Sequence, residues 1–257
     1  MKDFMELLTL YREPSMVGKG LMEAVITGRD FVRALLGEVL DEEDIAYTRR
    51  FDGVLEAVAS GKDRLSEIAA HLHSRGLTPS PSTSHVMKYV NALLKAGLLE
   101  RVEIWGKRRG SRYRHVSPLT DLIYWLNAKY GFFDIPLTME FLQKAVKQRI
   151  PTLVERFVEA LLAEVYGLKP VKILNPEIDV ALIRFKKIYL VAEVKWKGRV
   201  KKEDVRKAES KLSAYPDARK VLVVPDKAST PETWLEVMDI TDMVKLAKDG
   251  RKRLVGE

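Results

Sequence analysis

The feature that most constrains the fold of this chain is a pair of apolar, strand-like runs separated by a short basic turn. The second run, residues 188–196, reads IYLVAEVKW, and its alternation places Glu193 and Lys195 on one face. The first run, residues 178–185, reads IDVALIRF and carries Asp179. Two such runs at this spacing predict an antiparallel hairpin. A carboxylate from each strand and a lysine would then lie close together.

The register of this hairpin decides whether Asp179 and Glu193 share a face, because a slip of one residue sends a side chain to the opposite face. A two-residue turn at residues 186–187 would pair Asp179 with Val194 and separate the two carboxylates. A three-residue turn over residues 185–187 would pair Asp179 with Glu193. We therefore predict a three-residue connection or a β-bulge, both common in hairpins and near active sites.

The chemistry of these residues indicates a metal site of the kind that nucleases use. Hard cations such as Mg²⁺ or Mn²⁺ bind carboxylate oxygens, and a metal that holds a phosphate and acidifies water promotes phosphodiester hydrolysis. We expect Asp179 and Glu193 to bind the metal and Lys195 to position water or offset charge on the phosphate. The alternative is that Glu193-Val194-Lys195 occurs by chance and is surface decoration, since a second Glu-x-Lys, Glu209-Ser210-Lys211, occurs in a polar, helix-like stretch.

Composition narrows the classes of protein to which this chain can belong. Its 257 residues are enough for two domains. The absence of cysteine excludes disulfides, thiol catalysis and cysteine-bound zinc, and the four scattered histidines favour a carboxylate metal site. No apolar run reaches the length of a membrane helix, and the start MKDFMELLTLYREP is charged where a signal peptide is apolar. We therefore expect a cytoplasmic protein that neither crosses a membrane nor is exported.

Positive charge is concentrated in two segments rather than spread evenly. The formal net charge is +8. Residues 101–115 hold six basic residues and one acidic residue, and residues 193–211 hold eight basic and four acidic residues. Such patches indicate a polyanion as partner, although a charge run can also be a solvated face.

The sequence of residues 1–118 predicts helices followed by a winged helix. Residues 1–48 form a helical segment, with helices over 3–12, 17–26 and 28–38 and a break at Pro14. Residues 49–118 show three helices and then two strands around a basic tip, GKRRG. The three helices cover 51–60, 65–75 and 84–96, Gly97 ends the third, and the strands cover 98–105 and 111–118.

In a winged helix the third helix enters the major groove, while the wing contacts phosphates. We therefore expect DNA as partner, contacted by polar residues at the start of the third helix and by basic residues of the wing. The helix residues are Ser82, Thr83, Ser84, His85 and Lys88, and the wing residues are Lys107, Arg108, Arg109, Arg112 and Arg114. Winged helices also serve as protein docking modules, which is the alternative.

The remaining pattern predicts an α/β (α+β) domain. Helices over 119–129 and 137–148 form a connector, residues 119–150, and a helix over 153–166 then leads into the two strands. A helix over 201–213, a strand within 218–226 and a closing helix over 231–248 follow. The order helix, strand, strand, helix, strand predicts a mixed sheet flanked by helices over residues 151–257.

Several motifs resemble a known group, the archaeal ATPases whose C-terminal part joins a winged helix to a domain of the PD-(D/E)XK nuclease superfamily. The segment RYRHVSP followed by LIYWL resembles the link between their wing and an aromatic helix. The segments around Asp179 and Glu193-Val194-Lys195 resemble the two catalytic strands. The resemblance implies a restriction-endonuclease-like fold, and Glu159 as a further catalytic and metal-binding glutamate. Glu155, one helical turn earlier, is the second choice.

The resemblance also departs from that group in two ways. The nucleotide-binding core of the ATPases is missing, and Gly18-Lys19-Gly20 lacks the residues of a phosphate-binding loop. The proline of the PD motif is displaced to Pro176. Two main hypotheses follow: a Mg²⁺-dependent endonuclease that binds DNA, or a non-catalytic DNA-binding regulator that uses the nuclease-like domain as a scaffold or a homodimer interface. A protein-interaction adaptor is a third.

Overall fold

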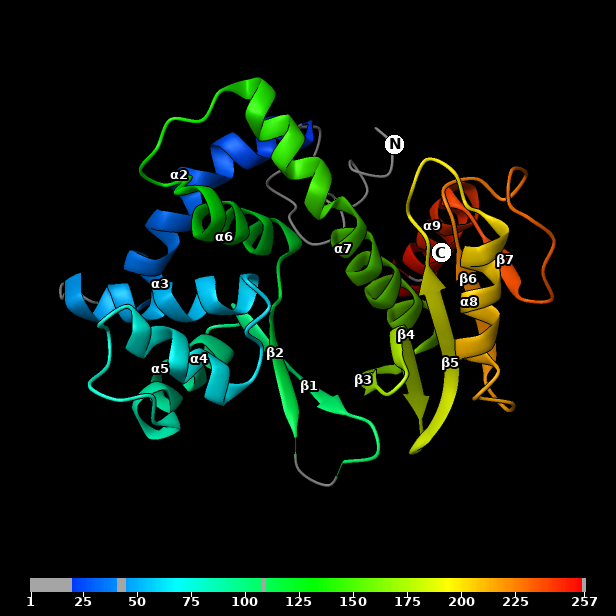
Figure 1. Ribbon diagram of the computed structural model, residues 1–257, viewed down its shortest axis with the longest axis horizontal. Helices are drawn as coiled ribbons and strands as arrows, with labels where there is room; N and C mark the ends of the chain where they lie inside the picture. The colour runs from blue at the N-terminus through cyan, green and yellow to red at the C-terminus, as the bar shows by residue number, and fades with distance from the viewer. Residues whose placement is uncertain (1–19, 41–44, 108–109, 256–257) are drawn as a thin grey trace. The chain divides into compact units, whose positions relative to one another are not determined.

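The computed structural model describes residues 20–40, 45–107 and 110–255 (Figure 1). These residues contain eight helices and seven strands of a mixed sheet, which confirms the predicted α/β class. By compactness the chain divides into two units. Unit 1 holds the described residues up to Val102 together with Ser111–Arg149, and unit 2 holds Glu103–Gly110 and the residues from Ile150 onward.

The boundary after Arg149 lies next to the predicted start of the nuclease-like domain at residue 151. The predicted domain boundaries after residues 48 and 118 do not divide unit 1. The predicted helix over 3–12, the break at Pro14 and two wing residues, Arg108 and Arg109, lie outside the described residues. None of the described helices is both long and apolar enough to cross a membrane.

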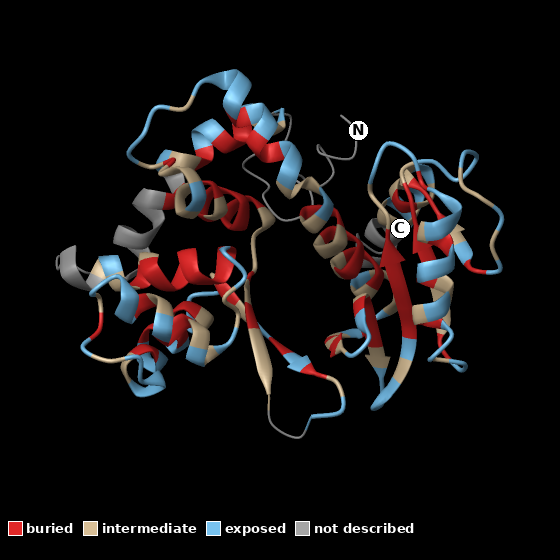
Figure 2. Cartoon of the chain, viewed as in Figure 1, coloured by how far each residue is buried: buried red, intermediate tan, exposed pale blue. Residues whose placement is uncertain are grey.

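Unit 1 follows the predicted order of helices and strands. Its elements are α2 (Leu21–Leu40), α3 (Ile45–Ala59), α4 (Leu65–Ser74), α5 (Thr83–Lys95), β1 (Leu99–Ile104), β2 (Ser111–His115), α6 (Pro118–Tyr130) and the first part of α7 (Met139–Tyr166). Ser82 caps α5 by accepting a hydrogen bond from the Ser84 N–H, and Gly97 follows α5 at φ 71°, as expected of a helix stop. Figure 2 shows buried segments on these helices where they face one another.

Helix α2 corrects one prediction, because residues 21–40 form one helix rather than two separated near residue 27. Gly28 lies inside this helix and against α6. A Cβ atom at Gly28 would stand 2.8 Å from the Cδ1 atom of Ile123 and 3.3 Å from the Cδ2 atom of Leu119. Glycine is thus used for close helix packing and not for a break.

The sheet of unit 2 is built from five strands and the end of β1. The strands are β3 (Lys169–Leu174), β4 (Glu177–Arg184), β5 (Lys187–Val194), β6 (Arg219–Val223) and β7 (Glu236–Met238). β3, β4 and β5 are antiparallel neighbours, β5, β6 and β7 are parallel neighbours, and Glu103 and Ile104 of β1 pair in parallel with β3. The predicted mixed sheet is therefore confirmed.

Helices cover both faces of this sheet. On one face, α8 (Lys202–Leu212) packs Val205, Ala208 and Leu212 on a core that includes Ala181 and Val191. On the other face, the strand residues that alternate with Ala181 and Val191 are also buried. The part of α7 after Ile150 buries an apolar stripe. Figure 1 shows α7 and α8 on opposite sides of β4 and β5. The strands therefore read as nearly continuous apolar runs, as expected of a sheet covered on both faces.

Three predictions about this region were wrong. β3 was missed, because Pro170 and the exposed Lys169 weaken its strand pattern. Residues 231–248 are not one helix: β7 comes first and α9 (Ile240–Val255) follows. The predicted helices over 137–148 and 153–166 are one helix, α7, with Pro151 inside it. Buried apolar residues on both sides of Pro151 offset the lost backbone hydrogen bond.

Candidate functional site

The hairpin of β4 and β5 places Asp179 opposite Glu193. Val180 pairs with Ala192 and Ala181 with Val191, so one further step in the same register brings Asp179 to Glu193. The predicted convergence of these two carboxylates on one face therefore holds.

A β-bulge sets this register. The turn has only two residues, Phe185 and Lys186, both at positive φ, and Arg184 pairs with Lys187 across it. The register then shifts between Leu182 and Ile183, which inserts Tyr189 as an extra residue in β5. Of the two predicted solutions, the bulge is confirmed and the three-residue turn is wrong.

Asp179 is fixed by the backbone of the neighbouring strand. Its Oδ2 atom accepts a hydrogen bond of 2.8 Å from the backbone N–H of Val194. The same oxygen lies 3.6 Å from the Nζ atom of Lys195. These contacts orient the carboxylate toward the end of β5, where Glu193 and Lys195 lie.

Glu193 is a fully buried carboxylate held by two ammonium groups. Its side chain is 0% exposed. The Nζ atom of Lys195 donates to its Oε2 atom at 2.7 Å, and the Nζ atom of Lys211 lies 3.0 Å from each oxygen. A buried charge needs such partners, because without them its desolvation would be strongly unfavourable.

Lys195 remains a cation in this setting. Burial acts to lower the pKa of Lys195, but the hydrogen bond to Glu193 and the negative charge of Asp179 outweigh burial and raise that pKa above its ordinary value. Its side chain is 22% exposed. A protonated, partly accessible ammonium group beside two carboxylates can bind an anionic oxygen of an incoming phosphate.

Lys211 is the site residue that sequence reasoning missed. It belongs to the second Glu-x-Lys motif, which lies in a polar, helix-like stretch and for which the sequence predicts no role in the site. Helix α8 buries Val205, Ala208 and Leu212, and Lys211 borders that stripe. Its position beside the apolar stripe is the signal that would have directed its long side chain toward the sheet.

Helix α7 adds a carboxyl group with unusual protonation behaviour. Burial and, after it, the negative charge of Asp179 raise the pKa of Glu155 to about 7. Glu155 therefore interacts electrostatically with the β4–β5 site and changes its charge near neutral pH. Glu159, the preferred residue from the resemblance, is 2% exposed in the same helix. The second choice, Glu155, thus couples electrostatically to Asp179.

The donor set at this site meets part of what a divalent cation needs. Among the described residues, no group of three or more His, Asp or Glu is placed to hold one ion, so Glu159 does not complete the predicted ligand set. Asp179 and Glu193 remain as a pair. Mg²⁺ is commonly held by one or two carboxylates together with water and substrate phosphate, so the pair suits Mg²⁺ in type and number. Binding would require a lysine to release one oxygen of Glu193.

The predicted DNA-binding residues of α5 lie at an accessible helix end. Ser82, Thr83, Ser84 and Lys88 are exposed, and His85 is half-buried with its Nδ1 atom 3.2 Å from the Ser80 hydroxyl. The Lys88 ammonium also stands 4.8 Å from the centre of the Tyr89 ring. The exposed surface of α5 is thus polar and basic at its start.

The wing residues differ in their surroundings. Lys107 is exposed. Arg112 forms an ion pair of 2.6 Å with Asp63, and its side chain is only 11% exposed. Arg114 pairs with Glu100 at 2.8 Å and is 12% exposed. Arg112 and Arg114 therefore hold the structure of unit 1 together, whatever further contacts they make.

Comparison of the chain with family models, with curated proteins and with solved structures gives no match.

Proposed function

We propose that this protein binds DNA and hydrolyses its phosphodiester bonds with Mg²⁺ or Mn²⁺, through a domain similar to the PD-(D/E)XK nucleases. The observation that carries the proposal is the bulge-set register that brings Asp179 opposite Glu193, with Lys195 hydrogen-bonded to Glu193. One residue of slip would separate the two carboxylates. A bulge that places charged side chains together inside an apolar sheet favours a functional site over decoration.

In this proposal Asp179 and Glu193 hold the metal ion, which would stabilise charge on the phosphate and lower the pKa of bound water. The ammonium groups of Lys195 and Lys211 move away from Glu193 and bind phosphate oxygens instead. Glu155, with a pKa of about 7, accepts a proton near neutral pH, as a general base does. DNA is held by the exposed start of α5 and by Lys107.

The test is cleavage of supercoiled, linear and branched DNA by purified protein with Mg²⁺ or Mn²⁺. Asp179→Ala and Lys195→Ala should each abolish cleavage. Asp179→Ala should lose cleavage alone and leave DNA binding intact. Glu203→Gln, at an exposed carboxylate on α8, is the matched control and should cleave normally. Ca²⁺ should bind without supporting turnover, because its larger radius relaxes the geometry of attack. Cleavage that survives Asp179→Ala would reject this site.

One observation favours a second candidate, the non-catalytic DNA-binding regulator. Both oxygens of Glu193 are already neutralised by lysine ammonium groups, so the site can be electrostatically satisfied without metal. The regulator would bind DNA with strong salt dependence but cleave none of the three substrates. Unchanged DNA binding in Asp179→Ala together with inactive wild-type protein would establish the regulator.

A further inference from the structure

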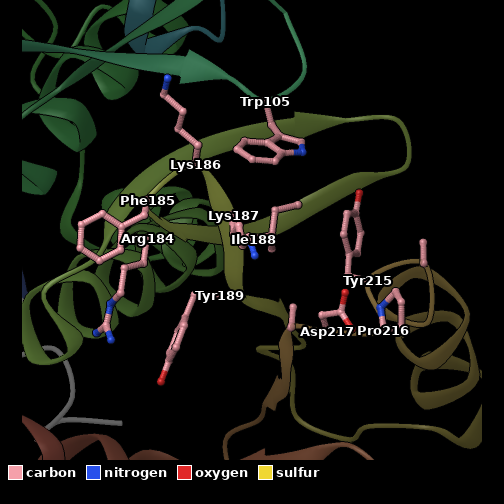
Figure 3. A pocket seen from close by; sticks show the side chains of 12 residues that line it. Trp105, Arg184, Phe185, Lys186, Lys187, Ile188, Tyr189, Tyr215, Pro216 and Asp217 are labelled. Atoms are coloured by element: carbon pink, nitrogen blue, oxygen red, sulfur yellow. The ribbon is translucent and has the colours of Figure 1, made fainter.

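The start of β5 borders a hollow in unit 2. β5 begins at Lys187, but its pairing with β6 begins only at Leu190, opposite Arg219. The first residues of β5 therefore extend beyond β6. A hollow of about 820 Å³ lies there, between the β4–β5 turn, the connection from α8 to β6 and Trp105 (Figure 3). Its volume is in the range of sites that hold a small organic group such as a nucleotide.

Aromatic side chains are the main feature of this hollow. Phe185 is 93% exposed and Tyr189 is 41% exposed, and Trp105 and Tyr215 also line the hollow. Figure 3 shows Trp105 and Tyr215 on either side of Ile188, and Phe185 beside Arg184. Ring faces that are open to solvent can stack on flat groups, above all on nucleobases.

The exposed Phe185 occupies a backbone conformation that opposes its residue type. Phe185 has φ 46° and Lys186 has φ 62°, both in the left-handed region. Turns of this type favour Asn and Gly, and a bulky residue there is strained. An exposed phenyl ring gains little from burial in return. Its presence at the tip is therefore not explained by folding and indicates binding.

Positive charge surrounds these rings. Arg184, Lys186 and Lys187 line the hollow, against a single acidic residue, Asp217. Within the described residues, Lys186 and Lys187 make no ion pair, and the Arg184 guanidinium stands 4.7 Å from the centre of the Tyr189 ring. Rings for bases and cations for phosphates together match single-stranded nucleic acid. A duplex keeps its bases stacked, so it has no base face to offer these rings.

We propose that this hollow binds a single-stranded segment of DNA, with a base stacked on Phe185. If the protein is the proposed nuclease, its substrate is then DNA with a single-stranded flap, fork or overhang. Only this choice of substrate rests on the proposed function. Lys187 and Glu193 are six residues apart on β5, or about 20 Å along the strand. A DNA strand bound at the hollow would therefore reach the Asp179–Glu193 site within a few nucleotides.

The test compares Phe185→Asn with wild type. Asn tolerates the left-handed conformation, so the turn should be kept or stabilised while the ring is removed. We expect Phe185→Asn to weaken binding of a fluorescent dT oligonucleotide about tenfold, in line with one lost base stack. Binding of a blunt duplex should be unchanged. Trp234→Asn removes an exposed aromatic ring, 58% exposed, outside the hollow, and should change neither affinity.

Three outcomes would overturn the proposal: an unchanged dT affinity in Phe185→Asn, an equal loss for the duplex, or an equal effect of Trp234→Asn. Thermal unfolding of Phe185→Asn shows whether the turn is intact. The proposed function fails separately. If no DNA is cleaved but Phe185→Asn selectively loses dT binding, the hollow stands without the nuclease. If cleavage is found while dT affinity is unchanged, the nuclease stands without the hollow.

Discussion

The Lys211 ammonium group on α8 lies 3.0 Å from each carboxylate oxygen of Glu193 on β5. Glu193 is fully buried, whereas Lys211 is 35% exposed. The lysine thus links the negative charge inside the sheet to the solvent side of the helix. This ion pair is a structural support for the site and also the contact that a metal ion would have to replace.

Lys211→Met should destabilise the protein, because it leaves the buried Glu193 with one ammonium partner instead of two. Breaking a buried ion pair costs about 3 to 5 kcal/mol, and the exposure of Lys211 and the remaining Lys195 reduce this to about 1 to 2 kcal/mol. Urea unfolding measures the change. Lys207→Met, one turn earlier in an exposed pair with Glu203, is the control and should leave the urea midpoint of unfolding unchanged.

Mg²⁺ should stabilise Lys211→Met more than it stabilises wild type. Without Lys211, one oxygen of Glu193 is available, so a cation that binds the folded state meets less competition. A ligand at one hundred times its Kd adds about 2.7 kcal/mol of stability. Thermal unfolding with and without Mg²⁺ measures this difference. An equal rise in Tm for both proteins would argue against metal binding at Glu193.

The hairpin of the site was predictable because its signals are local. The alternation of β5 and the parity between Asp179 and Glu193 required a bulge or a longer turn, and the bulge at Tyr189 is present. The choice between the two was not predictable. Phe185-Lys186 has none of the residues that favour a two-residue turn with positive φ, so its conformation comes from the tertiary structure.

The missed parts of the site depend on contacts between elements. Lys211 reaches Glu193 from eighteen residues away only because α8 packs on the sheet. The raised pKa of Glu155 comes from its burial and from the charge of Asp179, which depend on how α7 lies against β4. Strand β3, with Pro170, has a weak pattern by itself and is fixed by pairing with β4. Sequence periodicity contains none of these distances.

Lys88 and Lys107 should contribute to DNA binding through phosphate charge alone. The Lys88 side chain is exposed on α5, and the Lys107 side chain is exposed at the wing tip. Replacing each with Ala should weaken binding to all duplex sequences alike and reduce the slope of log K against log salt by about 0.9 per lost contact. Fluorescence anisotropy at several salt concentrations measures the slope. An unchanged slope would exclude these lysines from the DNA interface.

Arg112→Ala should behave differently from Lys107→Ala. Arg112 is nearly buried and pairs with Asp63 at 2.6 Å. Burial raises the pKa of Asp63, while Arg112 opposes this effect, so loss of Arg112 leaves Asp63 poorly compensated. We expect a loss of about 1 to 2 kcal/mol in the free energy of unfolding. Urea unfolding of the two variants at the same pH checks this distinction. Equal stability would show that the Arg112–Asp63 ion pair does not stabilise the folded protein.

Glu155 should make stability depend on pH in a predictable direction. Burial, followed by the charge of Asp179, raises its pKa from an ordinary value of 4.5 to about 7 in the folded state. Below pH 4.5 the carboxyl is protonated in both folded and unfolded protein and contributes no difference. As the pH rises from 4.5 to 7, the unfolded chain loses this proton before the folded protein does, so stability falls. Above pH 7 the full penalty, up to about 3 kcal/mol, is present.

Glu155→Gln removes that penalty, because the amide never ionises. The variant should therefore be more stable than wild type at pH 8 by up to about 3 kcal/mol and equally stable at pH 4. Urea unfolding at both pH values measures the difference. Glu164→Gln, at an exposed position of the same helix, is the control for the loss of one glutamate from α7. If Glu155→Gln gains nothing at pH 8, Glu155 is not the group that titrates beside Asp179. If it gains stability but loses cleavage, the carboxylate is retained for chemistry at the expense of stability, which is the pattern expected of a general base.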